Sequence, residues 1–327
     1  MRVIEIDQGS GPAEALRLAE RPDPTVAAGQ VRIRVHAAGV NRPDLLQRQG
    51  RYPAPSGASD ILGLEVSGEI DQVGEGVTGW AIGDRVCALL GGGGYAELAV
   101  VDARHLMQIP DGMTWVQAAA LPETVFTVFA NVFEAGGLKS GETFLIHGAT
   151  SGIGATAIQM AKAAGARVIA TSRGADKAAA ALTLGADISL DASQNGGQDS
   201  LAPVIADAGG VDVVLDMLGA EYSALNLKAL KPMGRWVVIA TLTGAKTEID
   251  LMQVMTKRIV LTGSTLRARP ADEKARLAAA IRETAWPWVV AGKVAPPIEA
   301  TFPLADAASA HRLLEAGRHV GKIVLTL

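Results

Sequence analysis

The sequence has few of the residues that build disulfides, cysteine-rich metal sites or nucleic-acid surfaces. Its 327 residues include one cysteine, Cys87, which excludes an intramolecular disulfide and a four-cysteine zinc site. Lysine and arginine number 30 against 34 acidic residues, so the net charge is −4 and no basic excess exists to neutralise phosphates. We therefore expect no nucleic-acid partner.

Long hydrophobic runs are also missing. No stretch of about 18 consecutive apolar residues indicates a membrane span, and residues 1–7 carry charges where a secretory signal needs an apolar run. Aromatic residues make up only 4%, whereas glycine numbers 37, which favours tight turns and close helix–sheet packing. These features predict a cytoplasmic protein without membrane contact, and the length predicts about two domains of roughly 150 residues.

Alternating apolar and polar residues predict β-structure in the first third of the chain, at 31–37, 65–73 and 95–101. A short helix is predicted from Pro43 to Gly50, because proline suits a first turn and glycine a stop. Further on, helical patterns separate nearly continuous apolar runs, as in a parallel sheet with both faces covered. The predicted strands are 142–147, 167–172, 187–190, 211–218, 235–241 and 259–265.

This order of elements predicts an α/β fold, a doubly wound parallel sheet of six strands inserted into a second, split domain. The nucleotide-binding domain is predicted at 121–265 and the catalytic domain at 1–120 and 266–327. The last segment is expected to hold helices at 271–284 and 304–316 and a final strand at 321–327.

A glycine-containing loop, 148–154 (GATSGIG), joins the first strand of that sheet to the following helix. Small residues let the backbone approach a pyrophosphate, and the helix start offers N–H groups and a positive dipole end. Of the usual G-x-G-x-x-G pattern only Gly154 remains, since Ala149 and Ser151 replace the first two glycines. The loop predicts a dinucleotide site; a tight turn without a ligand is the alternative.

The end of the next strand indicates which dinucleotide binds. NAD-preferring proteins usually place a carboxylate there for the ribose hydroxyl, but residues 170–174 (ATSRG) contain none. Ser172, Arg173 and Lys177 can instead hold a 2′-phosphate. NADPH is therefore the expected cofactor; Arg173 as a loop charge and Lys177 as a solvated helix lysine are the alternatives.

Residues 63–86 resemble the signature of the medium-chain dehydrogenase/reductase superfamily, through Gly63, Glu65, Gly68, Gly74 and Gly83. The family places a zinc-binding histidine where this chain has Leu64, and a cysteine ligand near 39–41, where it has Gly-Val-Asn. The segment from Asn41 to Tyr52, and a loop with Ala149, Gly152 and Ala155, are similar to the zinc-free NADPH:quinone oxidoreductases, closest to the tumour-suppressor-inducible group.

This resemblance covers nearly the whole chain and implies a Rossmann domain, a GroES-like, mainly β catalytic domain, no metal, and a homodimer that pairs edge strands near 259–265. Relatives often carry a tyrosine where this chain has Ala192. The cofactor contacts expected from the resemblance and the loop are Thr127, Ala149, Ser151, Gly152, Ile153, Ser172, Arg173, Lys177, Thr241, Leu266 and Lys322.

Asn41, Asp44 and Tyr52 are the expected catalytic residues, with Tyr52 hydrogen-bonding the acceptor carbonyl. Simpler alternatives are a helix cap for Asn41, a first-turn carboxylate for Asp44 and a packed loop aromatic for Tyr52. The expected activity is metal-independent reduction of quinones by hydride from NADPH, because a quinone is already electrophilic and needs no Lewis acid. An enal or enone reductase and a low-turnover NADPH-binding regulatory protein are the alternatives.

Overall fold

The computed structural model describes residues 1–193 and 201–327, and the chain forms two compact units. Unit 1 comprises Met1–Phe126, Arg267–Val290 and Ala295–Leu327; unit 2 comprises Thr127–Leu266 and Ala291–Val294. The predicted boundaries, 120/121 and 265/266, lie close to the crossings at 126/127 and 266/267. The short return of residues 291–294 to unit 2 was not predicted.

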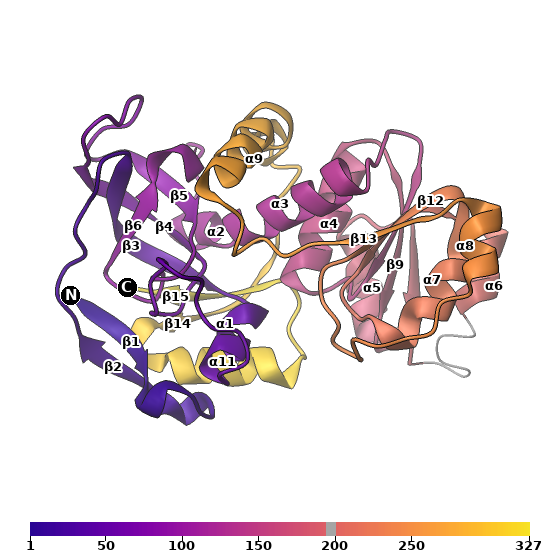
Figure 1. Ribbon diagram of the computed structural model, residues 1–327, viewed down its shortest axis with the longest axis horizontal. Helices are drawn as coiled ribbons and strands as arrows, with labels where there is room; N and C mark the ends of the chain where they lie inside the picture. Colours follow the sequence, from indigo (N-terminus) through magenta and orange to yellow (C-terminus); the bar gives the residue numbers. More distant parts are fainter. Residues whose placement is uncertain (194–200) are drawn as a thin grey trace. The chain divides into compact units, whose positions relative to one another are not determined.

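Unit 2 is built on a six-stranded sheet with the order β10-β9-β8-β11-β12-β13, and every neighbouring pair is parallel (Figure 1). The chain enters at β8 in the middle, extends to one edge and then returns to build the other half, as in doubly wound dinucleotide-binding folds. This confirms the predicted fold class. The strands are β8 (Thr143–His147), β9 (Arg167–Ser172), β10 (Ile188–Asp191), β11 (Val211–Asp216), β12 (Leu230–Val238) and β13 (Val260–Gly263).

Helices connect these strands, and right-handed crossovers place those of the two halves on opposite faces of the sheet. The side chains of α6 and α7 form one core with the sheet residues Leu145, Val214 and Trp236. The predicted helix at 221–231 ends earlier, because Leu230 already pairs with Val211 in β12. The helices are α4 (Gly152–Ala163), α5 (Ala175–Thr183), α6 (Leu201–Asp207), α7 (Ser223–Ala229) and α8 (Leu251–Lys257), with a 3-10 turn at Ala220–Tyr222.

Unit 1 contains a sheet with the order β14-β15-β3-β4-β5-β7, in which β6 also pairs with β3. The C-terminal strand β15 pairs antiparallel with β3, so the end of the chain completes the sheet begun by its first third (Figure 1). The strands are β3 (Gln30–Val40), β4 (Glu65–Val73), β5 (Arg85–Leu89), β6 (Leu98–Asp102), β7 (Leu106–Gln108), β14 (Ile298–Pro303) and β15 (Lys322–Thr326), beside a hairpin of β1 (Arg2–Ile6) and β2 (Leu16–Glu20).

The expected strand at 95–101 begins only at Leu98. Tyr95 and Ala96 are fully buried and are held by the N-terminal hairpin instead: the Ile4 N–H donates to the Tyr95 carbonyl at 2.9 Å, and Ala96 bridges to Val3. No sequence pattern predicted this hairpin, so residues 95 and 96 had no predicted partner.

The helices of unit 1 lie in its first and last segments. They are α1 (Arg42–Arg48), α2 (Trp115–Ala119), α9 (Ala271–Thr284), α10 (Trp286–Val290) and α11 (Ala307–Ala316). Helix α3 (Pro122–Val128) contains the boundary at 126/127 and leads into a π-helical segment of unit 2, Phe129–Ala135. The helix predicted at 271–284 has the bounds of α9, whereas the helix predicted at 304–316 is a 3-10 turn, Leu304–Asp306, followed by α11. Short 3-10 turns also occur at Asp7–Gly9, Ala13–Ala15 and Ala103–His105.

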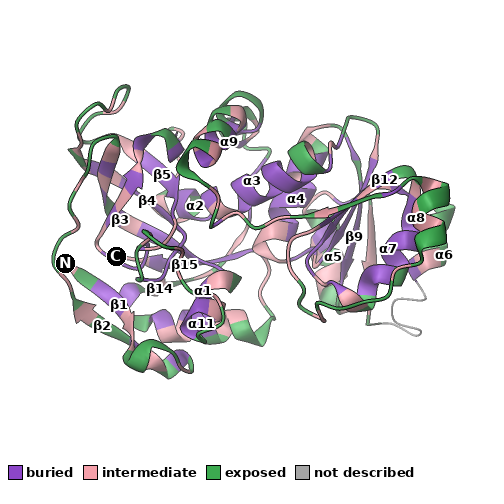
Figure 2. Cartoon of the chain, viewed as in Figure 1, coloured by how far each residue is buried: buried purple, intermediate pink, exposed green. Residues whose placement is uncertain are grey.

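The helical stretch Trp115–Ala135 is, by length and composition alone, able to cross a membrane. Most of its most apolar window, 78%, is nevertheless buried inside the protein, and the core helix of a soluble protein passes the same test. Figure 2 shows the same burial in the central strands β4, β5 and β9.

Candidate functional site

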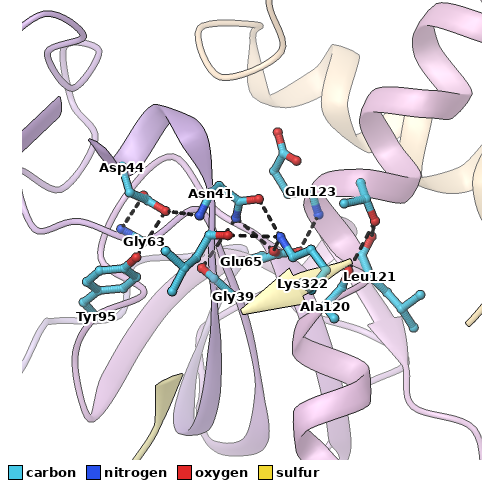
Figure 3. Close-up of polar contacts among 12 residues, drawn as sticks. Gly39, Asn41, Asp44, Gly63, Glu65, Tyr95, Ala120, Leu121, Glu123 and Lys322 are labelled. Atoms are coloured by element: carbon cyan, nitrogen blue, oxygen red, sulfur yellow. Dashed lines mark hydrogen bonds and ion pairs between the residues drawn. The ribbon is translucent and has the colours of Figure 1, made fainter. Parts of the chain in front are cut away.

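The corner between β3 and α1 holds a fully buried carboxylate, Asp44 (Figure 3). Its Oδ2 accepts hydrogen bonds from the backbone N–H of Asn41 at 2.7 Å and from the Tyr95 hydroxyl at 3.3 Å, and its Oδ1 accepts from the Gly63 N–H at 3.1 Å. Burial raises the pKa of the Asp44 carboxyl to about 6, against the lowering effect of the backbone donors. These contacts assign Asp44 a structural role at the helix start; its contact with an acceptor stays a prediction.

The hydrogen bonds of Asp44 continue through Tyr95 toward α11. The Tyr95 hydroxyl lies 3.1 Å from His311 Nε2, and Arg48 Nη1 lies 3.3 Å from His311 Nδ1. Arg48 also forms an ion pair with Glu315. Burial, assisted by the charge of Arg48, lowers the pKa of His311 to about 3, so the imidazole is neutral. With Arg48 donating to Nδ1, the Nε2–H donates to Tyr95, whose hydroxyl donates to Asp44.

A second buried cluster joins Glu65 on β4 to Lys322 on β15 (Figure 3). The Lys322 Nζ lies 2.6 Å from Glu65 Oε1, 2.6 Å from Asn41 Oδ1 and 3.4 Å from the Val40 carbonyl. The Asn41 Nδ2 donates to Glu65 Oε1 at 2.9 Å, and the Glu123 N–H donates to Glu65 Oε2 at 2.8 Å. Each charged group therefore has a full set of partners.

In this second cluster, every donor of Lys322 has an acceptor within the protein. An ammonium group has three donors, and the acceptors of Glu65, Asn41 and Val40 occupy all of them on a side chain that is 3% exposed. Lys322 therefore orients Asn41 and neutralises Glu65, and its contact with a cofactor stays a prediction. The predicted residues Asn41, Asp44 and Lys322 lie together in unit 1.

Tyr52 lies in the loop after α1, where it is half-buried. The guanidinium of Arg267 lies 5.5 Å from the centre of its ring, and Arg267 Nη1 donates to the Tyr52 carbonyl at 3.4 Å. Burial raises the pKa of the Tyr52 hydroxyl, which therefore keeps its proton at neutral pH. Tyr52 is thus a hydrogen-bond donor whose position is fixed by Arg267. Arg267 was not predicted as a site residue, although it directly follows the predicted contact Leu266.

In unit 2, the glycine-containing loop follows β8 and leads directly into α4. Gly148 has a φ of +70°, and a Cβ on Gly154 would lie 2.3 Å from the Gly148 carbonyl oxygen, so the close packing of α4 on the loop requires glycine at position 154. Ser151 caps the helix by accepting from the Gly154 N–H at 3.0 Å. The N–H groups of Gly152 and Ile153 lack intrahelical partners, as at any helix start, so the loop fits a pyrophosphate.

Ser172 ends β9, and its buried Oγ has no hydrogen-bond partner among the residues that the structure describes. The next residue, Arg173, is exposed, and Lys177 lies on the first turns of α5. Burial raises the pKa of the Tyr222 hydroxyl, and the charge of Arg173 opposes this rise. Tyr222 was not predicted, because nothing in the local sequence connects it to Arg173. An orphaned hydroxyl beside an exposed guanidinium fits the phosphate of a dinucleotide.

The end of β9 has no carboxylate, but the neighbouring strand β10 ends in one, Asp191. Asp191 at the end of β10 pairs in register with Ser172. Its Oδ1 accepts hydrogen bonds from the Gly174 N–H at 2.7 Å, the Ser193 N–H at 2.9 Å and the Ser193 hydroxyl at 2.6 Å. Asp191 therefore holds the loop that carries Arg173.

The predicted cofactor residues of unit 2 share one edge of its sheet. Residues 148–153 follow β8, Ser172 and Arg173 lie at the end of β9, Thr241 follows β12 and Leu266 follows β13. Because all strands are parallel, these positions are at the carboxyl edge, where open α/β sheets bind ligands. Thr127 is instead a buried residue of α3, and its carbonyl accepts from Asn131 Nδ2 at 2.8 Å.

Within residues 1–193 and 201–327, no three histidine, cysteine, aspartate or glutamate side chains are grouped as a metal site requires. Leu64, at the position of the zinc-binding histidine, is buried. Cys87 is also buried, which raises the pKa of its thiol.

Comparison with known proteins identifies the family. Residues 27–111 match the family described as alcohol dehydrogenase GroES-like domain, and residues 152–283 match the family described as zinc-binding dehydrogenase. Quinone oxidoreductase of Mus musculus is 31% identical over 331 residues, which cover 100% of this chain and 98% of that protein. The chain belongs to the medium-chain dehydrogenase/reductase superfamily.

Solved structures in this superfamily are similar over the full chain. Escherichia coli quinone oxidoreductase complexed with NADPH has a TM-score of 0.86 and 27% identity, covering 100% of both chains. CurK enoyl reductase has a TM-score of 0.84 and 28% identity, covering 99% of this chain and 98% of the other. The chain also matches two much longer polyketide synthases, from Streptomyces halstedii and Streptomyces orinoci, of which it spans 5% and 14% of the length.

Proposed function

We propose that this medium-chain dehydrogenase/reductase is an NADPH-dependent oxidoreductase that reduces quinones by hydride transfer without a metal. The observation that carries the proposal is the carboxyl edge of unit 2, where a glycine-containing helix start and the unpartnered Ser172 hydroxyl lie on adjacent strands. The full-length similarity to quinone oxidoreductases supports the choice of acceptor.

The residues at this edge have separate tasks in holding NADPH. The first N–H groups of α4 bind the pyrophosphate, because they point out of the helix at the positive end of its dipole. Ser172, Arg173 and Lys177 bind the 2′-phosphate, and the charge of Arg173 acts on the nearby Tyr222 hydroxyl. When bound, NADPH supplies the hydride.

The polar groups of unit 1 support chemistry that needs no metal. Glu65, the carboxylate of the glycine signature next to Leu64, is neutralised by Lys322 and by amide donors. A quinone accepts hydride without a Lewis acid, whereas a metal assists alcohol oxidation by stabilising an alkoxide. Tyr52 keeps its proton and donates to the acceptor oxygen.

Reduction of an enal or enone is the second candidate, supported by the similarity to CurK enoyl reductase. The test measures NADPH oxidation with 1,4-benzoquinone, 9,10-phenanthrenequinone and a series of 2-alkenals. Quinone turnover supports the proposal, and alkenal turnover without quinone turnover replaces it with the second candidate. NADPH binding without oxidation by any acceptor contradicts both.

A homodimer is part of the proposal, because unit 2 exposes an apolar edge. Val260 and Leu261 on the edge strand β13 are 49% and 47% exposed, and Leu251, Met252 and Met255 of α8 are more exposed still. Unpaired apolar edge strands are unusual in monomers. Sedimentation should give a dimer, and Leu261→Lys should give a monomer; a monomer in both cases contradicts this part of the proposal.

A further inference from the structure

Arg267 is a buried arginine of unit 1 whose side chain is held in place on several sides. Its Nε donates to the Gly91 carbonyl at 2.8 Å and its Nη1 to the Tyr52 carbonyl at 3.4 Å. Its own carbonyl accepts from the buried Lys274 Nζ at 2.6 Å. Both ends of the residue are fixed, which preorganises the guanidinium.

One nitrogen of this guanidinium is not used. Arg267 is 6% exposed, yet its buried Nη2 has no hydrogen-bond partner in the described part of the chain. A buried charged donor without a partner is unfavourable by more than an ordinary hydrogen bond contributes. By contrast Lys322, another buried cation of unit 1, has acceptors for all of its donors.

We propose that Arg267 Nη2 binds the acceptor oxygen on which negative charge develops during hydride transfer, with the Tyr52 ring beside it. The ligand class is a planar carbonyl compound that becomes an oxyanion: a quinone that becomes a hydroquinone anion, or an enone that becomes an enolate. The assignment rests on the proposed function and names a residue that contacts the acceptor.

The electron and proton balance of the step is simple. The hydride forms a C–H bond at the carbon conjugated to the carbonyl, the C=C π pair shifts toward the carbonyl carbon and the carbonyl π pair moves to oxygen. Arg267 donates a hydrogen bond to the resulting enolate oxygen, and a quinone-derived enolate tautomerises to the hydroquinone anion. Tyr52, whose phenol carries its proton at neutral pH, transfers a proton to that oxygen and regains one from water. A permanently charged donor fixed before the reaction is the arrangement that stabilises such an anion best.

The neighbouring groups favour an aromatic carbonyl compound over a phosphate. The guanidinium lies 5.5 Å from the Tyr52 ring centre, so a planar ligand that reaches Nη2 also reaches an aromatic side chain. The phosphates of the dinucleotide are assigned to the α4 start and to Arg173, both in unit 2.

The test uses 4-nitrophenol, whose anion combines an aromatic ring with a charged oxygen and has its own absorbance. The protein saturated with NADP⁺ is titrated at several pH values, with Arg267→Gln, Arg267→Lys and the matched control Arg312→Gln, an exposed arginine of the same unit. We expect Arg267→Gln to weaken binding of the anion about 10- to 100-fold, Arg267→Lys to weaken it less, and the control to have no effect.

Equal affinity for the anion in the unsubstituted protein and in Arg267→Gln overturns the proposal, as does no binding to the unsubstituted protein. A matching loss of NADPH affinity in Arg267→Gln also overturns it, because the guanidinium would then serve the cofactor. If nitrophenolate binding depends on Arg267 while no quinone or alkenal is turned over, the inference holds and the proposed function fails. A smaller loss of nitrophenolate affinity in Arg267→Lys than in Arg267→Gln shows that the positive charge, and not misfolding, accounts for the effect.

Discussion

The cluster around Lys322 in unit 1 and the ligand edge of the sheet in unit 2 differ in how their buried polar groups are paired. In unit 1, Asn41, Glu65 and Lys322 satisfy one another, and Asp44 is held by three donors. In unit 2, the hydroxyl of Ser172 is buried at the ligand edge of the sheet without a partner among the described residues. The difference teaches that hydrogen-bond saturation separates structural groups from ligand-binding groups better than residue type does.

The largest effect should come from breaking the saturated cluster. Lys322→Met leaves Glu65 as an unpaired buried carboxylate, and loss of one partner of a buried ion pair costs about 3–5 kcal/mol of stability. Urea unfolding measures it. The matched control is Arg2→Met, which removes an exposed pair with Glu97 and should cost at most about 1 kcal/mol. Equal effects would remove the distinction between buried and exposed pairs.

Asp44 should give unit 1 a characteristic pH dependence. Its pKa is raised from 3.8 to about 6 on folding, so the folded state holds the proton more tightly and stability falls as pH rises from about 4 to 6. This rise in the pKa of Asp44 corresponds to about 3 kcal/mol of unfolding free energy lost across that pH range. Unfolding measured against pH should show this fall in the unsubstituted protein and not in Asp44→Asn; identical profiles would contradict the assignment.

Substitution of the predicted phosphate-binding residues of unit 2 should change the affinity for the cofactor and leave the stability of the protein unchanged. Arg173→Ala with Lys177→Ala should weaken NADPH binding by about 1.5–3 kcal/mol per lost charged contact and leave NADH binding nearly unchanged. Fluorescence titration with both nucleotides measures this, and Lys139→Ala, an exposed lysine of the same unit, is the control. Equal losses for both nucleotides would refute the 2′-phosphate site.

The smallest expected effect tests the loop itself. In Gly154→Ala the new methyl would lie 2.3 Å from the Gly148 carbonyl, so α4 must shift away from the loop. Overpacking of this kind costs about 1–3 kcal/mol, and we expect a loss of affinity for NADPH and NADH alike. An equal loss of affinity for NADPH and NADH would distinguish this variant from the Arg173→Ala, Lys177→Ala double variant, which should affect NADPH alone. Unchanged affinity for both nucleotides would show that the loop does not contact the nucleotide.

Local patterns predicted the regular elements well. The strand at 65–73 and the helix at 271–284 have the predicted bounds, because a half-buried strand and a surface helix each leave a periodic signal. The hairpin of β1 and β2 and the strand β14 were missed. Short strands at a sheet edge or in an isolated pair carry too few inward-facing residues to form a pattern.

The candidate site was predictable only where it is local in sequence. The loop after β8 and the end of β9 were found, because strand, turn and helix follow one another directly. The hydrogen bonds of the Asn41 side chain were not predicted, because its partners Glu65 and Lys322 are 24 and 281 residues away in the sequence. Lys322 was assigned to the cofactor by resemblance alone, and no sequence pattern announces that a lysine will be fully paired.

Gly39 gives this arrangement an evolutionary consequence. A Cβ at this position would lie 2.1 Å from Glu65 Oε1 and 2.7 Å from the Ala119 carbonyl. A side chain could therefore enter position 39 only if Glu65 moved, and moving Glu65 would break its ion pair with Lys322. Substitutions at positions 39, 65 and 322 should accordingly be epistatic: a side chain at position 39 should be less harmful once the Glu65–Lys322 pair has been replaced.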